Sequence, residues 1–458
     1  MKRPSLAPAV VVTVAAFVTA WVLVRTSQSV LLDRIDAGDP TPIGEPPARP
    51  LGARGEATAP ARCVALGTPV SLAASGPGEL AFGDGVLDAR GVVAVGVVRG
   101  VGSERKASIL SFGLDRPSVE IVDVGPARGD DPPPRPVFVG DKVYAARIET
   151  SRGARALTFA SVAATSASDA GAIPQSADES LAFDVVADDG RVFAAWDDDD
   201  AGRGVIRLVG APAGTVLEGH APVVVVSPKT SDAEAPRLVA DGAGGVFVAW
   251  IARKPEGDAG GASEAKAHAL ESPAEEREAR AVEIVHVDVS GAVSTAQRLV
   301  PARVSDFDLE RSGSEVVVVM RDEDGAEARG ARLVRQSVRV EGAGLTASPP
   351  IVVMGAGVGA ADPILLDDGQ AGLAMVTDMA ERPRLVVVPS TPSTDAGAPS
   401  VEPAIDTGRV LASRSASALP PAGPRIRAAG RLEGRGAVVI SAGFPGGRPE
   451  ARILLCER

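Results

Sequence analysis

A pair of apolar segments joined by an Asp-Gly step recurs along the chain and constrains its fold more than any other feature. Residues 183–196 and 237–250 each contain a short apolar run, an Asp-Gly step and a second apolar run that ends in Trp196 or Trp250. Glycine takes the positive φ of a tight turn without steric cost, so Asp-Gly between two strand-like runs predicts a β-hairpin. Both segments are therefore predicted to be hairpins of the same kind.

Weaker copies of this hairpin and further strand-like runs cover the chain after residue 61. The copies recur at about 50–70 residues and lie at residues 91–98, 137–148, 315–320, 372–376 and 436–440. Strand-like runs between them lie at residues 205–209, 222–226, 281–289, 331–340, 351–354 and 385–388. A unit of four short strands every 50 or so residues is typical of a β-propeller blade.

The repeat predicts an all-β fold, a seven-bladed β-propeller over residues 61–458. Six units are expected at residues 76–128, 129–178, 179–234, 235–302, 303–356 and 357–410. The seventh has three C-terminal strands, at residues 425–429, 436–440 and 451–456, and takes its fourth strand from residues 63–72. Pairing of the first strand with the last would close the ring. A β-sandwich is the alternative, but its strands should alternate more clearly between apolar and polar residues.

The two cysteines of the chain, Cys63 and Cys456, lie in strand-like runs at opposite ends of the β region. In an exported chain, two distant cysteines indicate a disulfide. Ring closure would bring their strands side by side, so the ring and the disulfide are predicted together. The alternative is a pair of buried, unbonded thiols.

The N-terminus has the composition of a membrane anchor or an export signal. Lys2 and Arg3 precede an uncharged, mostly apolar run from Leu6 to Val24. As a helix this run would be about 28 Å long, close to the roughly 30 Å hydrocarbon core of a bilayer. Basic residues before the run favour a cytoplasmic N-terminus with the rest of the chain outside. We expect a transmembrane signal anchor over residues 1–25, with a cleaved signal peptide and a buried core helix as the alternatives.

Residues 26–60 are rich in Pro and Gly, which predicts an extended spacer between the membrane and the β region. The expected location is therefore membrane-anchored or secreted, with the bulk of the chain extracytoplasmic. The formal net charge is −12 and the chain has no basic stripe. Nucleic acid is therefore not an expected partner, because neutralisation of phosphates supplies most of the affinity for it.

Few residues carry recognisable chemistry. The three histidines, His220, His268 and His286, are expected to be exposed and without a function. Residues 355–360 match a loose dinucleotide-binding fingerprint, but the helix-breaking residues after them predict a glycine-rich connection between blades. We therefore predict no catalytic residues.

Four consecutive carboxylates are the most prominent charged feature. Asp197, Asp198, Asp199 and Asp200 would offer oxygen ligands to Ca²⁺ if all four lay in one loop, and the Ala-Gly step after them indicates a loop. The simpler interpretation is a solvated hairpin tip, whose charges keep a strand edge from pairing. We expect this second arrangement and no cofactor, with calcium as the alternative.

The apolar, Asp-Gly, apolar, Trp units resemble the divergent propeller repeats of exported bacterial proteins. The chain departs from two better-known propeller families: Trp196-Asp197 lacks the Gly-His partner of WD40 blades, and no Ser-x-Asp-x-Gly-x-Thr-Trp box of the sialidase type occurs. A sialidase-type Tyr nucleophile would have to be Tyr144, inside a predicted strand.

Propellers serve both as binding modules and as enzymes, so the fold class does not decide the function. The scarcity of histidine and the acidic loops favour a non-catalytic binding or scaffold module of the cell envelope, with an unknown protein or glycan as its ligand. The alternative is an extracytoplasmic hydrolase or lyase with its site at the central channel. A cluster of Arg, His and carboxylates at one mouth of the channel would favour the enzyme.

Overall fold

The structure, a computed structural model, divides the chain into two compact units, Met1–Thr58 and Ala59–Arg458. It describes residues 62–71, 81–114, 118–128, 131–151, 154–163, 165–173, 182–253, 279–301, 303–323, 331–362, 371–378, 383–389, 422–432, 435–443 and 450–457. The expected membrane segment from Leu6 to Val24 and the spacer over residues 26–60 lie outside these residues. Within the described ranges, no helix is long and apolar enough to cross a membrane.

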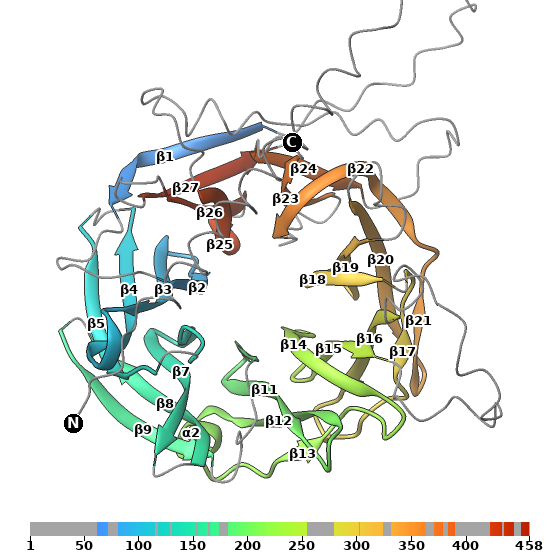
Figure 1. Cartoon of the computed structure of the whole chain (residues 1–458), viewed down its shortest axis with the longest axis horizontal. Coiled ribbons are helices and arrows are strands. Elements are labelled where there is room, and N and C mark those ends of the chain that lie inside the picture. Colours follow the sequence, from blue (N-terminus) through green and yellow to red (C-terminus); the bar gives the residue numbers. More distant parts are fainter. Residues whose placement is uncertain are drawn as a thin grey trace, which may run out of the picture. The chain divides into compact units, whose positions relative to one another are not determined.

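The described part of Ala59–Arg458 is built from consecutive antiparallel meanders. Four of its sheets have four strands each, in chain order. These strands are β2 (Ala81–Leu87), β3 (Val92–Arg99), β4 (Lys106–Gly113) and β5 (Glu120–Pro126); β6 (Arg135–Val139), β7 (Lys142–Ser151), β8 (Ala154–Val162) and β9 (Ala167–Ile173); β10 (Phe183–Asp188), β11 (Arg191–Asp199), β12 (Gly204–Pro212) and β13 (Val224–Val225); and β14 (Asp232–Ala240), β15 (Val246–Arg253), β16 (Arg280–Val287) and β17 (Gln297–Arg298). The first strand of each sheet contacts the first strand of the next, so the sheets follow one another around a common axis in a β-propeller-like arrangement (Figure 1).

A larger sheet replaces the predicted fifth and sixth units. Its strands are β18 (Val304–Ser312), β19 (Glu315–Asp322), β20 (Ala331–Glu341), β21 (Gly344–Ala347), β22 (Ile351–Asp362), β23 (Ala371–Asp378) and β24 (Pro383–Pro389). Their order is β18-β19-β20-β22-β23-β24, and the short β21 pairs with β20. The two units are joined because β22 pairs with β20 along its first part and with β23 along its last part.

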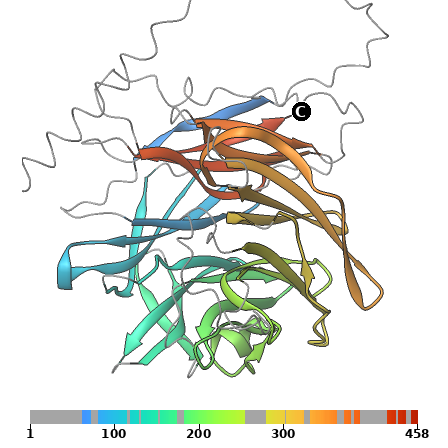
Figure 2. The ribbon, with the colours of Figure 1, turned by 45° about the vertical axis from the view of Figure 1, so that its right-hand side comes forward.

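The last sheet brings together the two ends of the β region. Its strands, in spatial order, are β1 (Arg62–Ser71), β27 (Glu450–Glu457), β26 (Arg435–Gly443) and β25 (Ala422–Leu432). β1 lies beside β27 (Figures 1 and 2) and pairs with it in antiparallel register. In this register Cys63 lies directly opposite Cys456. The backbone positions that the predicted disulfide needs are therefore adjacent, and the bond itself stays a prediction.

The turn between β10 and β11 forms as its sequence predicts. Asp189 and Gly190 are its two central residues, with φ of 44° and 75°, and Asp188 pairs with Arg191 across them. Positive φ at both central residues defines the type I′ turn, whose twist matches that of the flanking strands. The Asp-Gly step therefore sets the register of this hairpin.

Apolar side chains fill the space between neighbouring sheets. Trp196 in β11 is fully buried in a cluster with Ile148 and Phe159 of the preceding sheet. Trp250 in β15 is fully buried in a cluster with Leu208 of the sheet before it. The two repeated tryptophans thus occupy equivalent places, and strands with both faces packed in this way have no reason to alternate in polarity.

The structure differs from the sequence predictions in two local features. Residues 355–360 lie inside strand β22 and not in a connection between blades, because this strand pairs with β20 and β23. Two short helices, α2 (Ala213–Leu217) and the 3-10 helix η1 (Gly102–Glu104), were not predicted. The buried Val216 and Leu217 attach α2 to the same core cluster as Trp196.

Candidate functional site

The first strands of successive sheets surround a central cavity of about 160 Å³. Five of them contribute charged side chains to its lining; β18 contributes Glu310 in addition to Asp308, and β25 contributes Ala428. Apart from Glu310, the charged residues are Asp84 from β2, Arg135 from β6, Asp184 from β10, Arg237 from β14 and Asp308 from β18. The sign of the charge therefore alternates from one sheet to the next. We call these five residues the channel cluster.

Four members of the channel cluster occupy the same place in their sheets. Each lies opposite a small or β-branched residue of the second strand, in the pairs Arg135–Ala146, Asp184–Ala195, Arg237–Ala249 and Asp308–Val319. In the sheets of Asp184 and Arg237, the residue after this alanine is the repeated tryptophan, Trp196 or Trp250. The repeat therefore brings one side chain per sheet to the same level around the axis.

β-Bulges accompany the cluster on three of its strands. The register of β2 shifts between Phe82 and Gly85, around Asp84. The register of β14 shifts just before Arg237, and that of β18 shifts just before Asp306. A bulge redirects side chains and is over-represented next to functional sites. The strands are thus locally irregular where their charged residues reach the cavity.

Direct ion pairs hold the cluster together. The Arg135 guanidinium lies between two carboxylates, with Nη2 2.8 Å from Asp84 Oδ2 and Nη1 2.9 Å from Asp184 Oδ1. The backbone N–H of Leu238 in β14 donates to Asp184 Oδ2 at 2.8 Å. Asp184 thereby connects its own strand with β6 on one side and β14 on the other.

Arg237 is surrounded by negative charge. Burial by itself would lower the pKa of this guanidinium, but four carboxylates raise the pKa above its usual value. These carboxylates belong to Asp84, Asp184, Asp306 and Asp308. Arg237 is therefore always positively charged, and its charge is shared among several aspartates.

Asp308 has a different protonation behaviour from the usual aspartate. Burial raises the pKa of its carboxyl well above the usual range, the charge of Arg237 lowers it, and the charge of Asp84 raises it again. The backbone N–H of Leu309 also donates to Asp308 Oδ1 at 2.8 Å. The cavity therefore contains one carboxyl that holds its proton at a pH at which an ordinary aspartate has lost it.

The cluster was not predicted from the sequence, although its signal is visible there. A charged residue directly precedes or interrupts an apolar run of the inner strand in each of these five sheets, and in two of them it follows a phenylalanine, as Phe183-Asp184 and Phe307-Asp308. The cluster supplies the Arg and carboxylate part of the pattern expected of an enzyme, without a histidine among the described lining residues.

The four carboxylates at the end of β11 do not act together. Asp197 to Asp199 belong to the strand, so the prediction that all four lie in a loop is wrong for them. Asp197 accepts hydrogen bonds from the backbone N–H groups of Ala182 and Ala235, at 2.9 and 3.3 Å. Successive strand residues point to opposite faces, which separates these side chains.

Asp198 pairs with Arg207 of the neighbouring strand β12, and the last two carboxylates of the run stabilise the turn that follows. Asp199 Oδ1 accepts a hydrogen bond from the Gly202 N–H at 2.8 Å, and Asp200 lies 3.5 Å from Arg203. Both aspartates are exposed at the tip of the hairpin. In the part of the chain that the structure describes, no group of three or more His, Cys, Asp or Glu residues is placed to hold a metal ion.

The histidines have different environments. His220 is exposed, as predicted, whereas His268 lies outside the described residues. The prediction of an exposed His286 is wrong: its side chain is 13% exposed and its Nε2 lies 2.8 Å from Asp241 Oδ2. The imidazole also packs against the ring of Phe247, with 4.7 Å between the ring centroids. His286 therefore fastens β16 to the β14–β15 turn and lies outside the central cavity.

Comparisons with known proteins give no family. No protein-family model and no curated protein sequence matches the chain. Among solved structures, the β-propeller domain of the Trilobed protease from Pyrococcus furiosus, described as having an open velcro topology, is 11% identical with a TM-score of 0.45, over 82% of this chain and 93% of that one. The BP39L lectin from Burkholderia pseudomallei is 12% identical with a TM-score of 0.43, and the match covers 69% of this chain and 82% of the lectin chain. The polysaccharide lyase Uly1 is 10% identical with a TM-score of 0.47, and the match covers 81% of this chain and 89% of the lyase chain. At these scores the likeness carries no functional argument.

Proposed function

We propose that this protein is an extracytoplasmic, membrane-anchored binding module that recognises a glycan at the channel cluster. In this proposal the segment from Leu6 to Val24 holds the protein at the membrane, and residues 26–60 extend the β region away from it. The β region is a seven-bladed propeller closed by the pairing of β1 with β27. In this proposal the protein binds its ligand without converting it.

The observation that carries the proposal is the alternation of carboxylate and guanidinium groups around one small cavity. A sugar hydroxyl both donates and accepts a hydrogen bond, so neighbouring hydroxyls are best matched by acceptors and donors in turn. Asp84, Arg135 and Asp184 offer such a series from the first strands of three successive sheets. Their mutual ion pairs hold the series rigid before any ligand arrives, which lowers the entropic cost of binding. The cavity of about 160 Å³ favours a single terminal sugar over a longer segment of chain.

Binding of the full-length protein in detergent to a panel of immobilised glycans tests the proposal. Arg135→Gln removes the charged guanidinium between two carboxylates, and we expect it to weaken binding by at least about tenfold, as for the loss of a charge-assisted hydrogen bond. Arg339→Gln is the matched control, because this arginine is 57% exposed and lies 3.9 Å from its nearest carboxylate. It should leave binding unchanged.

Thermal unfolding of both variants separates a lost contact from a lost fold. Binding of no glycan by the wild-type protein would refute the proposal. So would unchanged glycan binding in a folded Arg135→Gln variant.

The second candidate function is hydrolysis of a glycan at the same place, and Asp308 is the observation that favours it. A carboxyl with a raised pKa next to ionised carboxylates is the arrangement from which a general acid and its partner are drawn in glycoside hydrolysis. Under this hypothesis the wild-type protein releases reducing ends from a bound glycan, and Asp308→Asn abolishes release while binding persists. Absence of release from every glycan that binds would exclude the hydrolase.

A further inference from the structure

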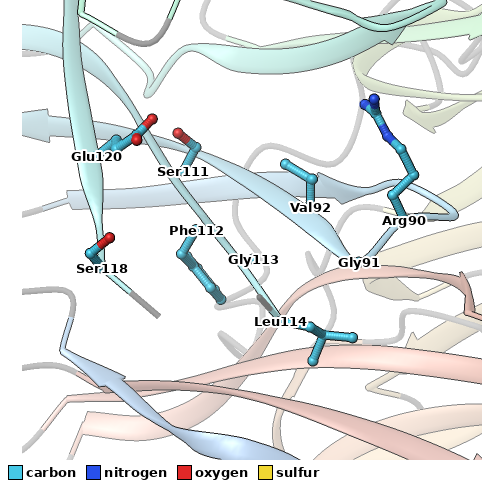
Figure 3. Close-up of a pocket in the computed structure, with 9 residues that line it drawn as sticks. All are labelled: Arg90, Gly91, Val92, Ser111, Phe112, Gly113, Leu114, Ser118 and Glu120. Carbon is cyan, nitrogen blue, oxygen red and sulfur yellow. The ribbon is translucent and has the colours of Figure 1, made fainter. Parts of the chain in front are cut away.

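A second and larger cavity lies at one end of the first sheet, away from the channel cluster. Its volume is about 320 Å³, within the range of small-molecule sites. It is enclosed by the turn between β2 and β3 and by the facing ends of β4 and β5 (Figure 3). None of the residues around it belongs to the central cavity. An inference from this cavity therefore does not depend on the glycan proposal.

One wall of the second cavity is polar and unpaired. Ser111 in β4 lies directly opposite Glu120 in β5, so the two side chains project from the same face of the sheet. Figure 3 shows the carboxylate and this hydroxyl close together, with Ser118 on the same side of the cavity. Within the described residues, the side chains of Ser111, Ser118 and Glu120 have no hydrogen-bond or ion-pair partner. Their oxygens are therefore available to a ligand.

The opposite wall and the floor are apolar. Val92, Phe112 and Leu114 line the cavity beside the polar wall. Gly91 brings the β2–β3 turn close to this floor: it has φ of +79°, and a Cβ at this position would lie 2.8 Å from Leu114 Cδ1. The backbone N–H of Leu114 donates to the Gly91 carbonyl at 3.3 Å, which fixes the distance between the turn and β4. The cavity lining thus includes hydrogen-bond acceptors and apolar residues.

The charge of the cavity is negative. Arg90 at its far side is already neutralised, because its Nε lies 2.6 Å from Asp88 Oδ2. Asp88 is itself held in the turn, where its Oδ1 accepts hydrogen bonds from the N–H groups of Arg90 and Val92 at 2.9 and 2.8 Å. Glu120 has no such partner among the described residues. Among the residues that the structure describes around this cavity, the Glu120 carboxylate is therefore a negative charge without a counter-ion, next to two hydroxyl groups.

We propose that this cavity binds a small primary amine with an apolar body. An ammonium group has three N–H donors and no acceptor, and the Glu120 carboxylate with the Ser111 and Ser118 hydroxyls supplies acceptors for all three. The hydrocarbon part of the ligand lies on Val92, which pairs with Gly113 and so projects from the same face of the sheet as Ser111, and it removes the exposed part of Val92 from water.

Calorimetric titration of the full-length protein in detergent tests this proposal with two probes that share one apolar body and differ at the amine. Leucinamide carries the ammonium group and an apolar side chain, and N-acetylleucinamide has the same body without the charge. At about pH 6 the amine of leucinamide is protonated. We expect saturable binding of leucinamide, with a dissociation constant in the millimolar range or below, and no saturable binding of the acetylated compound.

Variants identify the site. Glu120→Gln keeps the shape of the side chain and should weaken leucinamide binding by roughly 10- to 100-fold, as for a lost charge-assisted hydrogen bond. Ser111→Ala should weaken it by a smaller factor. Glu104→Gln, at an exposed glutamate of the same sheet region, is the matched control and should leave binding unchanged. Equal binding of the two probes, an absence of saturable leucinamide binding, or full binding by both Glu120→Gln and Ser111→Ala would overturn the proposal.

Discussion

Loss of the predicted Cys63–Cys456 bond is the sharpest test of how the ring is held together. The two residues are direct partners in the β1–β27 register. Directly opposite residues of antiparallel strands have Cα atoms about 4.5–5.5 Å apart, within the range of about 4.4–6.8 Å that a disulfide requires. The backbone therefore allows the bond without rearrangement. We expect it to form once the β region is outside the cytoplasm.

The expected stabilisation follows from the length of chain that the bond encloses. Cys63 and Cys456 are 393 positions apart (456 − 63). The chain-entropy model gives roughly 5–6 kcal/mol for a loop of this length, an upper value because strain and residual structure usually reduce it. At about 2.1 cal/mol/K per residue, a unit of this size has an entropy of unfolding near 0.8 kcal/mol/K. A contribution of about 3–6 kcal/mol then corresponds to a rise in the unfolding midpoint of about 4–7 °C.

Unfolding of the purified, exported protein with and without reductant measures this contribution. The unfolding midpoint of the wild-type protein should fall when reductant is added. The Cys63→Ser/Cys456→Ser variant should unfold at the midpoint of the reduced wild type, both with and without reductant. Thiol titration in denaturant provides the independent readout, with no free thiol expected in the oxidised protein. Two free thiols, or a wild-type midpoint that does not respond to reductant, would refute the bond.

Four further substitutions test the packing and the charges of the fold. Gly96→Ala would place a Cβ 1.5 Å from the carbonyl oxygen of Pro134, and in denaturant titrations it should cost at least about 1–3 kcal/mol. Trp250→Phe should destabilise the protein by about 1 kcal/mol more than Trp196→Phe. The reason is that Trp250 Nε1 donates to a serine hydroxyl at 3.4 Å, whereas Trp196 Nε1 is buried with no partner among the described residues; equal losses would contradict this. The pKa of Asp308 is raised in the folded state. As the pH rises above the usual pKa of an aspartate, ionisation of Asp308 therefore lowers the free energy of unfolding. Asp308→Asn should therefore be more stable than the wild type at neutral pH and lose this advantage below about pH 4, and a variant that is less stable at neutral pH would show that the reasoning is wrong.

The sequence predicted the hairpins well because their determinants are local. The step Asp189-Gly190 carries the information for its turn within two residues, and the structure has that turn. The pairing of β20 with β22, which joins two predicted units into one sheet, is a contact between segments that are brought together only in the folded protein. No short-range pattern in the chain reports that pairing.

The channel cluster was missed for a related reason. Charged residues such as Asp184 and Asp308 lie within or beside short apolar runs of the inner strands, and a charge in such a strand is usually at a solvated position. Whether such a charge is solvated or buried in an ion pair depends on the residue that the neighbouring sheet places beside it, as Arg135 is placed beside Asp184. The error about His286 has a similar origin. Alternation correctly places this side chain opposite Val285 and Val287, but in stacked sheets the opposite face is covered by a neighbour and does not face solvent.

The double pairing of β22 has a consequence for how the molecule opens. In repeat proteins each unit contacts only its neighbours, and local unfolding divides the array at the contacts between units. Here a continuous ladder of backbone hydrogen bonds crosses one such junction, from β20 through β22 to β23. Amides on both sides of this junction should exchange with solvent in a single cooperative step, while the first four sheets open separately. The array is thereby divided into mechanical units of unequal size, and the largest of them lies between β18 and β24.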